Sequence, residues 1–360
     1  MPAARYRRLM SRMRDAEPPD PSERGLAMPP DWAPHARTWM CWPCRAEIWG
    51  SDDALLAAKQ ATARIARAIS TFEPVVLAAR REDIPAAKLA TAGKVQIFET
   101  QLDDSWARDS GPTFLKGDDG RAAVQWLFNA WGGKYQPHAD DAELATRIAE
   151  FCNLEVLNAP LICEGGAIHS DGEGTLITTE QCLANPNRNP HLGKEEIEFL
   201  LQRYTGVRQV IWLGSGFCDD ETDGHVDNIA CFAGPGRVIV GVPSSPSLPD
   251  AAPVQEAIRR LKAARDAMGR RLEVIELPQP RRVRFDWRGR ILQTSYVNFY
   301  LANGGLVMPS FDDPNDDKAE AVLAQCFPGR DILQVEVLDL LQGGGGIHCI
   351  SLGEPAADTA

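Results

Sequence analysis

A cysteine near the end of the chain has the surroundings expected of a nucleophile. Four consecutive glycines, Gly343 to Gly346, precede Ile347, His348 and Cys349. Glycine loses more backbone entropy on folding than any other residue, so a run of four is costly unless the fold needs the space. We expect the glycines to let the backbone turn sharply and pass close to a substrate, and so to present Cys349 as a thiolate nucleophile.

Carboxylates and a histidine occupy three earlier loops. Asp109 lies in SWARDSGP, Glu164 lies in CEGGAIH, and DETDGHVDN carries Asp223, His225 and Asp227. A cysteine protease needs one group to orient its histidine, and further acids would raise the pKa of the thiol and repel an oxyanion. The same acids suit a guanidinium, a planar cation that binds carboxylates in bidentate fashion. We therefore expect a guanidine whose central carbon is held over the sulfur.

The elements that position these loops repeat along the chain as a helix, a strand, a loop and a second strand. Helices are predicted at 52–70, 141–153, 195–204, 254–268 and 318–326, with Ser51 or Asp52 capping the first. Each is followed by a strand, at 74–79, 154–162, 208–214, 272–278 and 332–341. The second strands are predicted at 113–115, 175–179, 226–232, 283–285 and 349–352. Five such units at a spacing of about 60 residues, with no linker between them, predict one domain closed into a pseudo-symmetric ring.

Composition excludes several classes of partner. The net charge of −12 over 360 residues argues against nucleic acid or an anionic membrane and suits a small cationic substrate. No apolar run reaches the roughly 18–20 residues that a membrane span needs. Nine cysteines without a disulfide-like spacing indicate a reducing, cytoplasmic location. Residues 1–27 are rich in Pro, Arg and acids, which predicts a disordered tail before the domain at 28–360.

Seven segments, in order, resemble the agmatine deiminases of the bacterial-type peptidylarginine deiminase family. They are MPPDWAPHARTWMCWP, DDSWARDSGPTF, FNAWGGKY, EGGAIHSDGEGTLITTEQCLANPNRNP, DETDGHVDNIACF, YVNFYLANGGLVMPSF and GGGGIHCIS. The resemblance covers nearly all of residues 28–355. It implies a five-bladed α/β propeller (a pentein) and the hydrolysis of agmatine to N-carbamoylputrescine and ammonia, a step of putrescine and polyamine biosynthesis. It implies neither cofactor nor metal.

The resemblance also implies a role for each matched residue. Cys349 would form a covalent amidino-thioether, and His225 would pass a proton to the departing ammonia and then activate water. Glu164 would orient the imidazole, while Asp109 and Asp227 would clamp the guanidinium.

The resemblance places further residues around the substrate. Trp106 and Glu221 would line the pocket, with Glu221 facing a second cationic group, and Asp223 would contribute to binding from the same acidic loop. The family commonly has Asn at the position of Gly346, three residues from the sulfur. On the alternation of a strand beginning at Cys349, His348 is expected to point away from the site.

Agmatine and arginine differ at the end of the molecule remote from the guanidinium. The loop CDDETDGH has four acids and no basic residue, so it should attract an ammonium and repel the α-carboxylate of arginine. Two basic features keep open the alternative of a peptidylarginine or free-arginine deiminase. One is Arg108, which we expect to pair with a nearby acid, and the other is the basic run 281–285, which could reach the pocket mouth. The acidic loops with their histidine also leave open a metal-dependent hydrolase or an inactive ring that only binds cations. A homodimer or higher homo-oligomer stays open as well.

Overall fold

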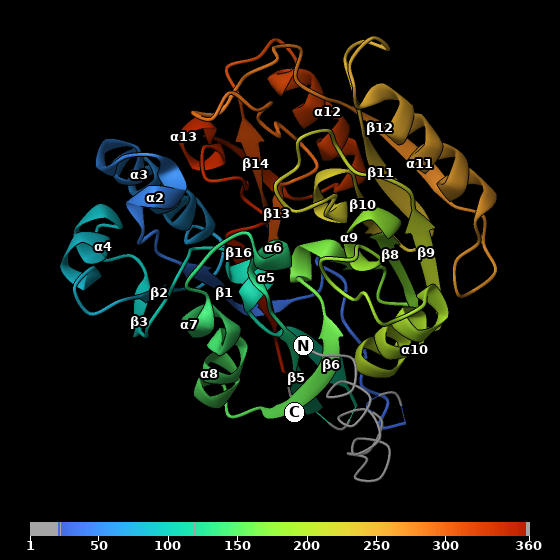
Figure 1. Cartoon of the computed structure of the whole chain (residues 1–360), viewed down its shortest axis with the longest axis horizontal. Coiled ribbons are helices and arrows are strands. Elements are labelled where there is room, and N and C mark those ends of the chain that lie inside the picture. The colour runs from blue at the N-terminus through green and yellow to red at the C-terminus, as the bar shows by residue number, and fades with distance from the viewer. Residues whose placement is uncertain (1–20, 22, 119, 358–360) are drawn as a thin grey trace.

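The computed structural model describes residue 21 and residues 23–118 and 120–357 (Figure 1). The strands of these residues form five separate small sheets. In sheet order they are β16 (Ser351–Pro355), β1 (His35–Cys41), β2 (Val75–Ala79) and β3 (Gln96–Glu99); β4 (Thr113–Gly117), β5 (Gly120–Leu127) and β6 (Glu155–Ile162); β7 (His169–Ser170), β8 (Thr175–Thr179) and β9 (Gln209–Leu213); β10 (Ala230–Gly234), β11 (Arg237–Val242) and β12 (Glu273–Pro278); β13 (Tyr300–Ala302), β14 (Gly305–Ser310) and β15 (Asp331–Glu336).

All five sheets share one plan. The first two strands are antiparallel, and the second and third are parallel. A helix connects each parallel pair, as a parallel crossover requires. These helices are α3 (Asp52–Ile69), α8 (Leu144–Phe151), α10 (Lys194–Thr205), α11 (Ala251–Ala263) and α12 (Asp316–Cys326). Figure 1 shows them on the outside of the molecule, with the sheets arranged around a common centre.

The remaining helices are short. They are α2 (Ala46–Trp49), α4 (Ile84–Ala90), α5 (Ala107–Ser110), α6 (Ala130–Gly133), α7 (Ala139–Ala142), α9 (Glu180–Leu183) and α13 (Leu338–Leu341), with 3₁₀ turns η1 (Gly165–Ala167) and η2 (Val226–Asn228). The short helix α5 lies near the centre in Figure 1 and carries a predicted site residue, Asp109.

The first sheet contains both ends of the folded chain. Strand β16 pairs antiparallel with β1, in a register that places Trp39 opposite Leu352. Strand β1 in turn pairs parallel with β2, where Met40 lies opposite Leu77. The C-terminal strand therefore completes the sheet that the N-terminal strand begins.

Local sequence explains the outer layer. In α3 the side chain of Ser51 accepts a hydrogen bond from the Ala54 amide (3.1 Å), the N-cap that the sequence predicts. The buried residues Ala58, Ala61, Ile65 and Ile69 recur at helical spacing and face the core. Every residue of β2 is buried, as expected for a parallel strand covered on both faces.

The five long helices and the start of the strand after each are confirmed, but the strand predicted at 332–341 ends at Glu336 and residues 338–341 form α13. The helix predicted to reach residue 268 ends at Ala263. Each unit also has a further strand that the prediction lacks. Strands β1, β5 and β11 lie between the predicted strands of their sheets, and β7, β13 and β14 were not predicted either. The predicted strand at 283–285 is wrong, since it makes only a Phe285–Ile291 bridge that closes a hairpin. The predicted strand at 349–352 begins instead at Ser351, and residues 347–350 form a turn.

The ordered chain begins before Met28. Leu26 is buried, and Ala27 forms an antiparallel bridge with Lys116, so residues 23–27 are not part of a disordered tail. The rest of that predicted tail lies outside the described residues. Across the part of the chain with assigned structure, we find no helix with the length and apolar character needed to cross a bilayer.

Candidate active site

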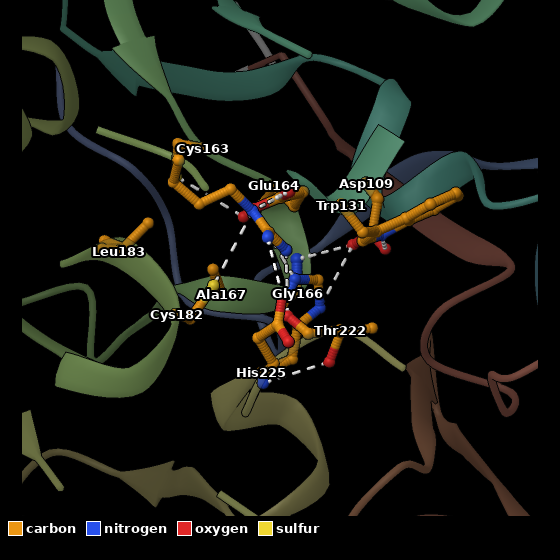
Figure 2. A network of polar contacts seen from close by, with 12 residues as sticks. Asp109, Trp131, Cys163, Glu164, Gly166, Ala167, Cys182, Leu183, Thr222 and His225 are labelled. Atoms are coloured by element: carbon orange, nitrogen blue, oxygen red, sulfur yellow. Dashed lines mark hydrogen bonds and ion pairs between the residues drawn. The ribbon is translucent and has the colours of Figure 1, made fainter. Parts of the chain in front are cut away.

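The predicted site residues lie on connections between sheets. The connection from β3 to β4 carries Asp109, that from β6 to β7 carries Glu164, and that from β9 to β10 carries His225 and Asp227. The connection from β15 to β16 carries Cys349. Figure 2 shows Asp109, Glu164 and His225 gathered around Gly166. Connections that are far apart in sequence thus supply one buried cluster.

Cys349 lines a cavity of about 280 Å³. The residues that line the cavity are Trp106, Asp109, Trp131, Tyr135, Glu221, Thr222, Gly343, Gly344, Gly345 and Cys349. Its thiol is 3% exposed, and burial, followed by the Asp227 and Asp109 carboxylates, raises its pKa well above the ordinary value. A cation bound between these carboxylates would offset both influences and favour the thiolate.

His225 is fully buried between two carboxylates. Its Nδ1 lies 3.7 Å from Asp109 Oδ1, and its Nε2 lies 3.7 Å from Glu164 Oε2. Burial disfavours the imidazolium, but Asp109 most strongly, with Cys182 and Glu164, raises the pKa of His225 well above its ordinary value. Neither ring nitrogen has a hydrogen-bond partner among the described residues, and the ring is held by the two carboxylates through these longer contacts.

Arg188 fixes the carboxylate of Glu164. Its Nε donates to Glu164 Oε1 (2.6 Å), and both side chains are completely buried. Burial would raise the pKa of Glu164, but Arg188 and then His225 lower it, so this carboxylate is charged. The other end of Arg188 donates to the Thr222 carbonyl oxygen and to Asp223 Oδ2, both at 2.9 Å. Arg188 therefore ties Glu164 to the loop that carries His225.

Asp223 does not line the cavity. Its Oδ2 lies 2.8 Å from Lys134 Nζ and 2.9 Å from both Asn187 Nδ2 and Arg188 Nη1. These donors lower its pKa against the opposing influence of burial. The structure thus places Asp223 behind the cavity wall, where it holds Arg188 and Lys134 in place.

Gly166 occupies the space between the catalytic candidates. Its amide donates to Asp109 Oδ1 (3.0 Å), while Trp131 Nε1 donates to Oδ2 of the same carboxylate (2.9 Å). A Cβ at position 166 would lie 2.6 Å from His225 Nδ1 and 3.0 Å from Asp227 Oδ2. Only glycine fits here. Gly166 was not predicted as a site residue. The paired glycines of EGGAIH were the available sequence signal for it.

Asp227 links the sulfur to a second histidine. Its Oδ2 lies 3.6 Å from Cys349 Sγ and 2.9 Å from His348 Nδ1. Burial opposes ionisation, but His348 lowers the pKa of Asp227. The prediction that His348 points away from the site is wrong. Because residues 347–350 form a turn instead of a strand, strand alternation does not apply to them.

Two groups of side chains have the composition of metal sites, namely Asp31 with His169 and His348, and Glu164 with Cys182 and His225. In the first group the Phe232 amide donates a hydrogen bond to His169 Nδ1 (3.4 Å), so Nδ1 carries no proton. A neutral imidazole must then carry its proton on Nε2, the nitrogen that lies 3.3 Å from Asp31. A protonated nitrogen does not ligate a metal. In the second, the Arg188 guanidinium already neutralises Glu164. Hydrogen bonds and ion pairs account for both groups.

The glycine run 343–346 packs against aromatic side chains and also lines part of the cavity. Added Cβ atoms at Gly343 and Gly345 would each lie 2.5 Å from an indole ring, of Trp49 and Trp106 respectively, and Gly344 has a left-handed φ of 103°. Gly343 and Gly345 thus make room for tryptophan rings, while the approach of this backbone to a substrate stays a prediction.

The side chain of Asn298 occupies the space next to Gly346, close to the sulfur of Cys349. A Cβ at Gly346 would lie 2.5 Å from Asn298 Oδ1. Asn298 Nδ2 lies 3.3 Å from Cys349 Sγ, which helps to lower the pKa of the thiol against the larger effect of burial. Asn298 was not predicted, and its place in YVNFYLANGG was the available signal.

Glu221 lines the cavity, as predicted, but it has partners already. Its Oε1 accepts a hydrogen bond from the Tyr135 hydroxyl (2.7 Å), and Oε2 contacts Arg290 and lies 3.7 Å from Arg288. Arg108 pairs at 3.5 Å with Asp31, an acid distant in sequence.

The basic run 281–285 is turned away from the cavity. The amides of Arg281 and Arg282 donate to Asp313 Oδ2, and the Arg284 guanidinium donates to the Phe311 carbonyl oxygen.

Comparisons with known proteins agree along most of the chain. The family model described as Porphyromonas-type peptidyl-arginine deiminase matches residues 27–355. An agmatine deiminase of Stutzerimonas stutzeri is 42% identical, with 93% of this chain and 97% of the relative covered. The structure of the Enterococcus faecalis agmatine deiminase aligns with a TM-score of 0.90 at 34% identity and covers 94% of this chain and 98% of that one. A C. jejuni agmatine deiminase with substrate bound aligns with a TM-score of 0.83 at 27% identity, covering 92% and 97%.

Proposed function

Because this chain belongs to the Porphyromonas-type peptidyl-arginine deiminase family, we propose that it hydrolyses agmatine to N-carbamoylputrescine and ammonia. It is a hydrolase that acts on a C–N bond of a linear amidine. The observation that carries this proposal is the cavity that Cys349 lines together with the carboxylates of Asp109 and Glu221. Asp109 would pair with the guanidinium of agmatine and Glu221 with its ammonium.

The fold supports a five-bladed pentein propeller in one domain spanning residues 28–360. Five sheets of one strand plan follow one another in the chain, and β16 pairs with β1 across the ends of that series. The connections that carry Asp109, Glu164, His225 and Cys349 then lie at the axis, where they meet.

Substrate binding would activate the nucleophile. The guanidinium would lie between Asp109 and Asp227, whose bidentate hydrogen bonds suit its planar N–H groups. Its positive charge would offset the two carboxylates that raise the pKa of Cys349, and the thiol proton would leave to solvent. The thiolate would then attack the guanidinium carbon to give a tetrahedral adduct.

His225 would carry protons in both halves of the reaction. As an imidazolium it would protonate the leaving nitrogen, so that ammonia departs and the amidino-thioether remains. The neutral ring, oriented by Glu164, would next take a proton from water as the water attacks the same carbon. Loss of the Cys349 sulfur from that adduct would release N-carbamoylputrescine and restore the enzyme.

Parallel kinetics test the substrate. Ammonia release should give a higher kcat/KM for agmatine than for arginine or a peptide with C-terminal arginine, because Glu221 would repel the α-carboxylate. An equal or higher value for either arginine substrate would show that the agmatine assignment is wrong. Adding EDTA should leave the rate unchanged, whereas loss of activity would favour a metal-dependent hydrolase.

The cysteines support a cytoplasmic location. All nine lie within the described residues as free thiols, which suits a reducing compartment.

A further inference from the structure

Glu221 lines the cavity, and its carboxylate is paired with two arginines. Arg290 contacts its Oε2, and Arg288 Nη1 lies 3.7 Å from the same oxygen. Arg290 is also held by Asp286, with its Nε 2.9 Å and its Nη2 2.8 Å from Oδ2. An ammonium that approaches Glu221 through the cavity therefore meets a carboxylate that Arg290 already shares.

Residues 285–291 form a hairpin that carries Arg288 and Arg290. This hairpin contacts two segments beside the cavity. Asp286 and Arg290 are joined by a backbone hydrogen bond of 2.8 Å, and the Phe285–Ile291 bridge closes the hairpin. On one side the Trp287 amide donates to Gln342, the residue before the glycine run (3.0 Å). On the other side the Ile291 amide donates to Asp219 of the acidic loop (3.4 Å).

Little apolar burial holds the hairpin in place. Phe285 and Trp287 are 60% and 50% exposed, and Val283 just before them is also exposed. The Trp287 ring lies over Gly50, where an added Cβ would be 2.7 Å from the ring. Segments with few buried apolar contacts open at low free-energy cost. The polar contacts of Arg288, Arg290 and Trp287 are therefore a large part of what keeps the hairpin against the mouth.

We propose that Arg290 is a specificity-determining residue that competes with the remote cation of the substrate for Glu221. The inference rests on the proposed function, in which agmatine places its ammonium at Glu221. A guanidine with a remote ammonium must displace Arg290 or share the carboxylate with it, whereas a guanidine with an uncharged tail has no such competitor. Arg290 thus weakens the binding of cationic substrates selectively.

The test compares agmatine with pentylguanidine, in which a methyl group replaces the ammonium. For Arg290→Gln we expect KM for agmatine to fall about five- to tenfold, since a partly exposed ion pair is worth roughly 1 kcal/mol. We expect kcat for agmatine and KM for pentylguanidine to change less than about twofold.

Arg282→Gln is the matched control. It lies just before the hairpin in a more exposed ion pair with Asp312 (2.7 Å) and does not line the cavity, so neither substrate should be affected. If Arg290→Gln does not fold, Arg290→Lys keeps the charge with a shorter reach and should lower KM in the same direction for agmatine alone.

Each outcome decides between the proposals. A KM that falls for agmatine and not for pentylguanidine supports the competition. The competition is overturned if KM changes equally for both substrates, does not change, or rises for agmatine. In each of these cases the wild-type enzyme still turns over agmatine, so the proposed function is unaffected. Wild-type enzyme that does not turn over agmatine would instead refute the proposed function itself.

Discussion

Asp227 and His348 form a hydrogen-bonded pair directly beside the sulfur of Cys349. The two side chains are 2.9 Å apart, and the far nitrogen of His348 lies 2.8 Å from Asp31 Oδ2. Burial and Arg108 lower the pKa of His348, but its bonds to Asp227 and Asp31 raise it overall. His348 is thus held between two carboxylates that favour its protonated form, and it keeps Asp227 oriented and lowers the pKa of that carboxyl.

Replacing His348 should impair the enzyme through Asp227. In His348→Gln the pKa of Asp227, lowered in the fold, should rise because its main stabilising bond is lost. The acidic limb of kcat/KM against pH should then move to higher pH, and kcat/KM at neutral pH should fall about tenfold, the cost of one charged hydrogen bond. A pH profile of unchanged shape would show that His348 only fills space.

Cys349→Ser should abolish turnover without unfolding the protein. A hydroxyl near neutral pH is a far weaker nucleophile than a thiolate, and serine is close to cysteine in size. Mass spectrometry of quenched wild-type enzyme should find a substrate-derived adduct on Cys349. An adduct on Cys41 or Cys44 would contradict the assignment.

The guanidinium clamp can be tested by neutral replacements of equal size. Asp109→Asn and Asp227→Asn remove a charge and present donors to the donors of the substrate. Breaking a buried charged pairing costs about 3–5 kcal/mol, so kcat/KM should fall at least a few hundredfold. Steady-state kinetics with agmatine measure this. A mild effect at both positions would place the clamp elsewhere.

Gly166→Ala should disrupt the site by a single methyl group. The added Cβ would lie 2.6 Å from His225 Nδ1 and 2.9 Å from Asp109 Oδ1, so these groups must move. We expect kcat/KM to fall at least a hundredfold, since misplacement by about 1 Å can cost that much. Gly193→Ala is the control, because its Cβ would make only ordinary contacts at 3.5 Å or more. Equal activity of the two variants would refute the steric argument.

His225 should make the stability of the protein depend on pH. Its pKa is raised in the fold, so the stabilisation from its carboxylate partners is complete below the unfolded value near 6.5. That stabilisation is lost as the pH rises through the folded pKa. The difference in free energy of unfolding between wild type and His225→Gln should therefore be largest below pH 6.5 and shrink in alkaline buffer, as urea titrations would measure. A difference that grows with pH would mean that the pKa of His225 is lowered.

Periodicity in the sequence predicted the elements whose extent depends on local residue patterns. The helix α3 has a capping serine and a regular apolar face, so its extent followed from the residues, and the family followed from seven motifs in order. The strand at 283–285 was predicted as the second strand of the fourth repeated unit, yet Val283 and Phe285 are exposed, because this segment lacks a neighbouring strand. A position in a repeat does not show that a partner strand exists.

The site residues that escaped prediction depend on contacts between distant segments. Arg188 follows α9 in the sequence and gives no sign that it will be buried against Glu164. Asp31 comes from the segment before β1 and reaches His348 through the fold. The nucleophile and its acids stood out because their loops are rich in glycine and charge. Their supporting partners have no such local signature.

The pairing of β16 with β1 has a consequence for how the protein is made. Strand β1 leaves the ribosome early and β16 late, so one edge of β1 stays unpaired while the intervening sheets are synthesised. Cys349 precedes β16 by two residues, and the anchoring of the nucleophile therefore waits for the last strand to dock. A nascent chain with every other sheet folded would lack both the anchored thiol and His348, the partner that orients Asp227. Activity would then begin in a single step, when the two ends of the fold meet.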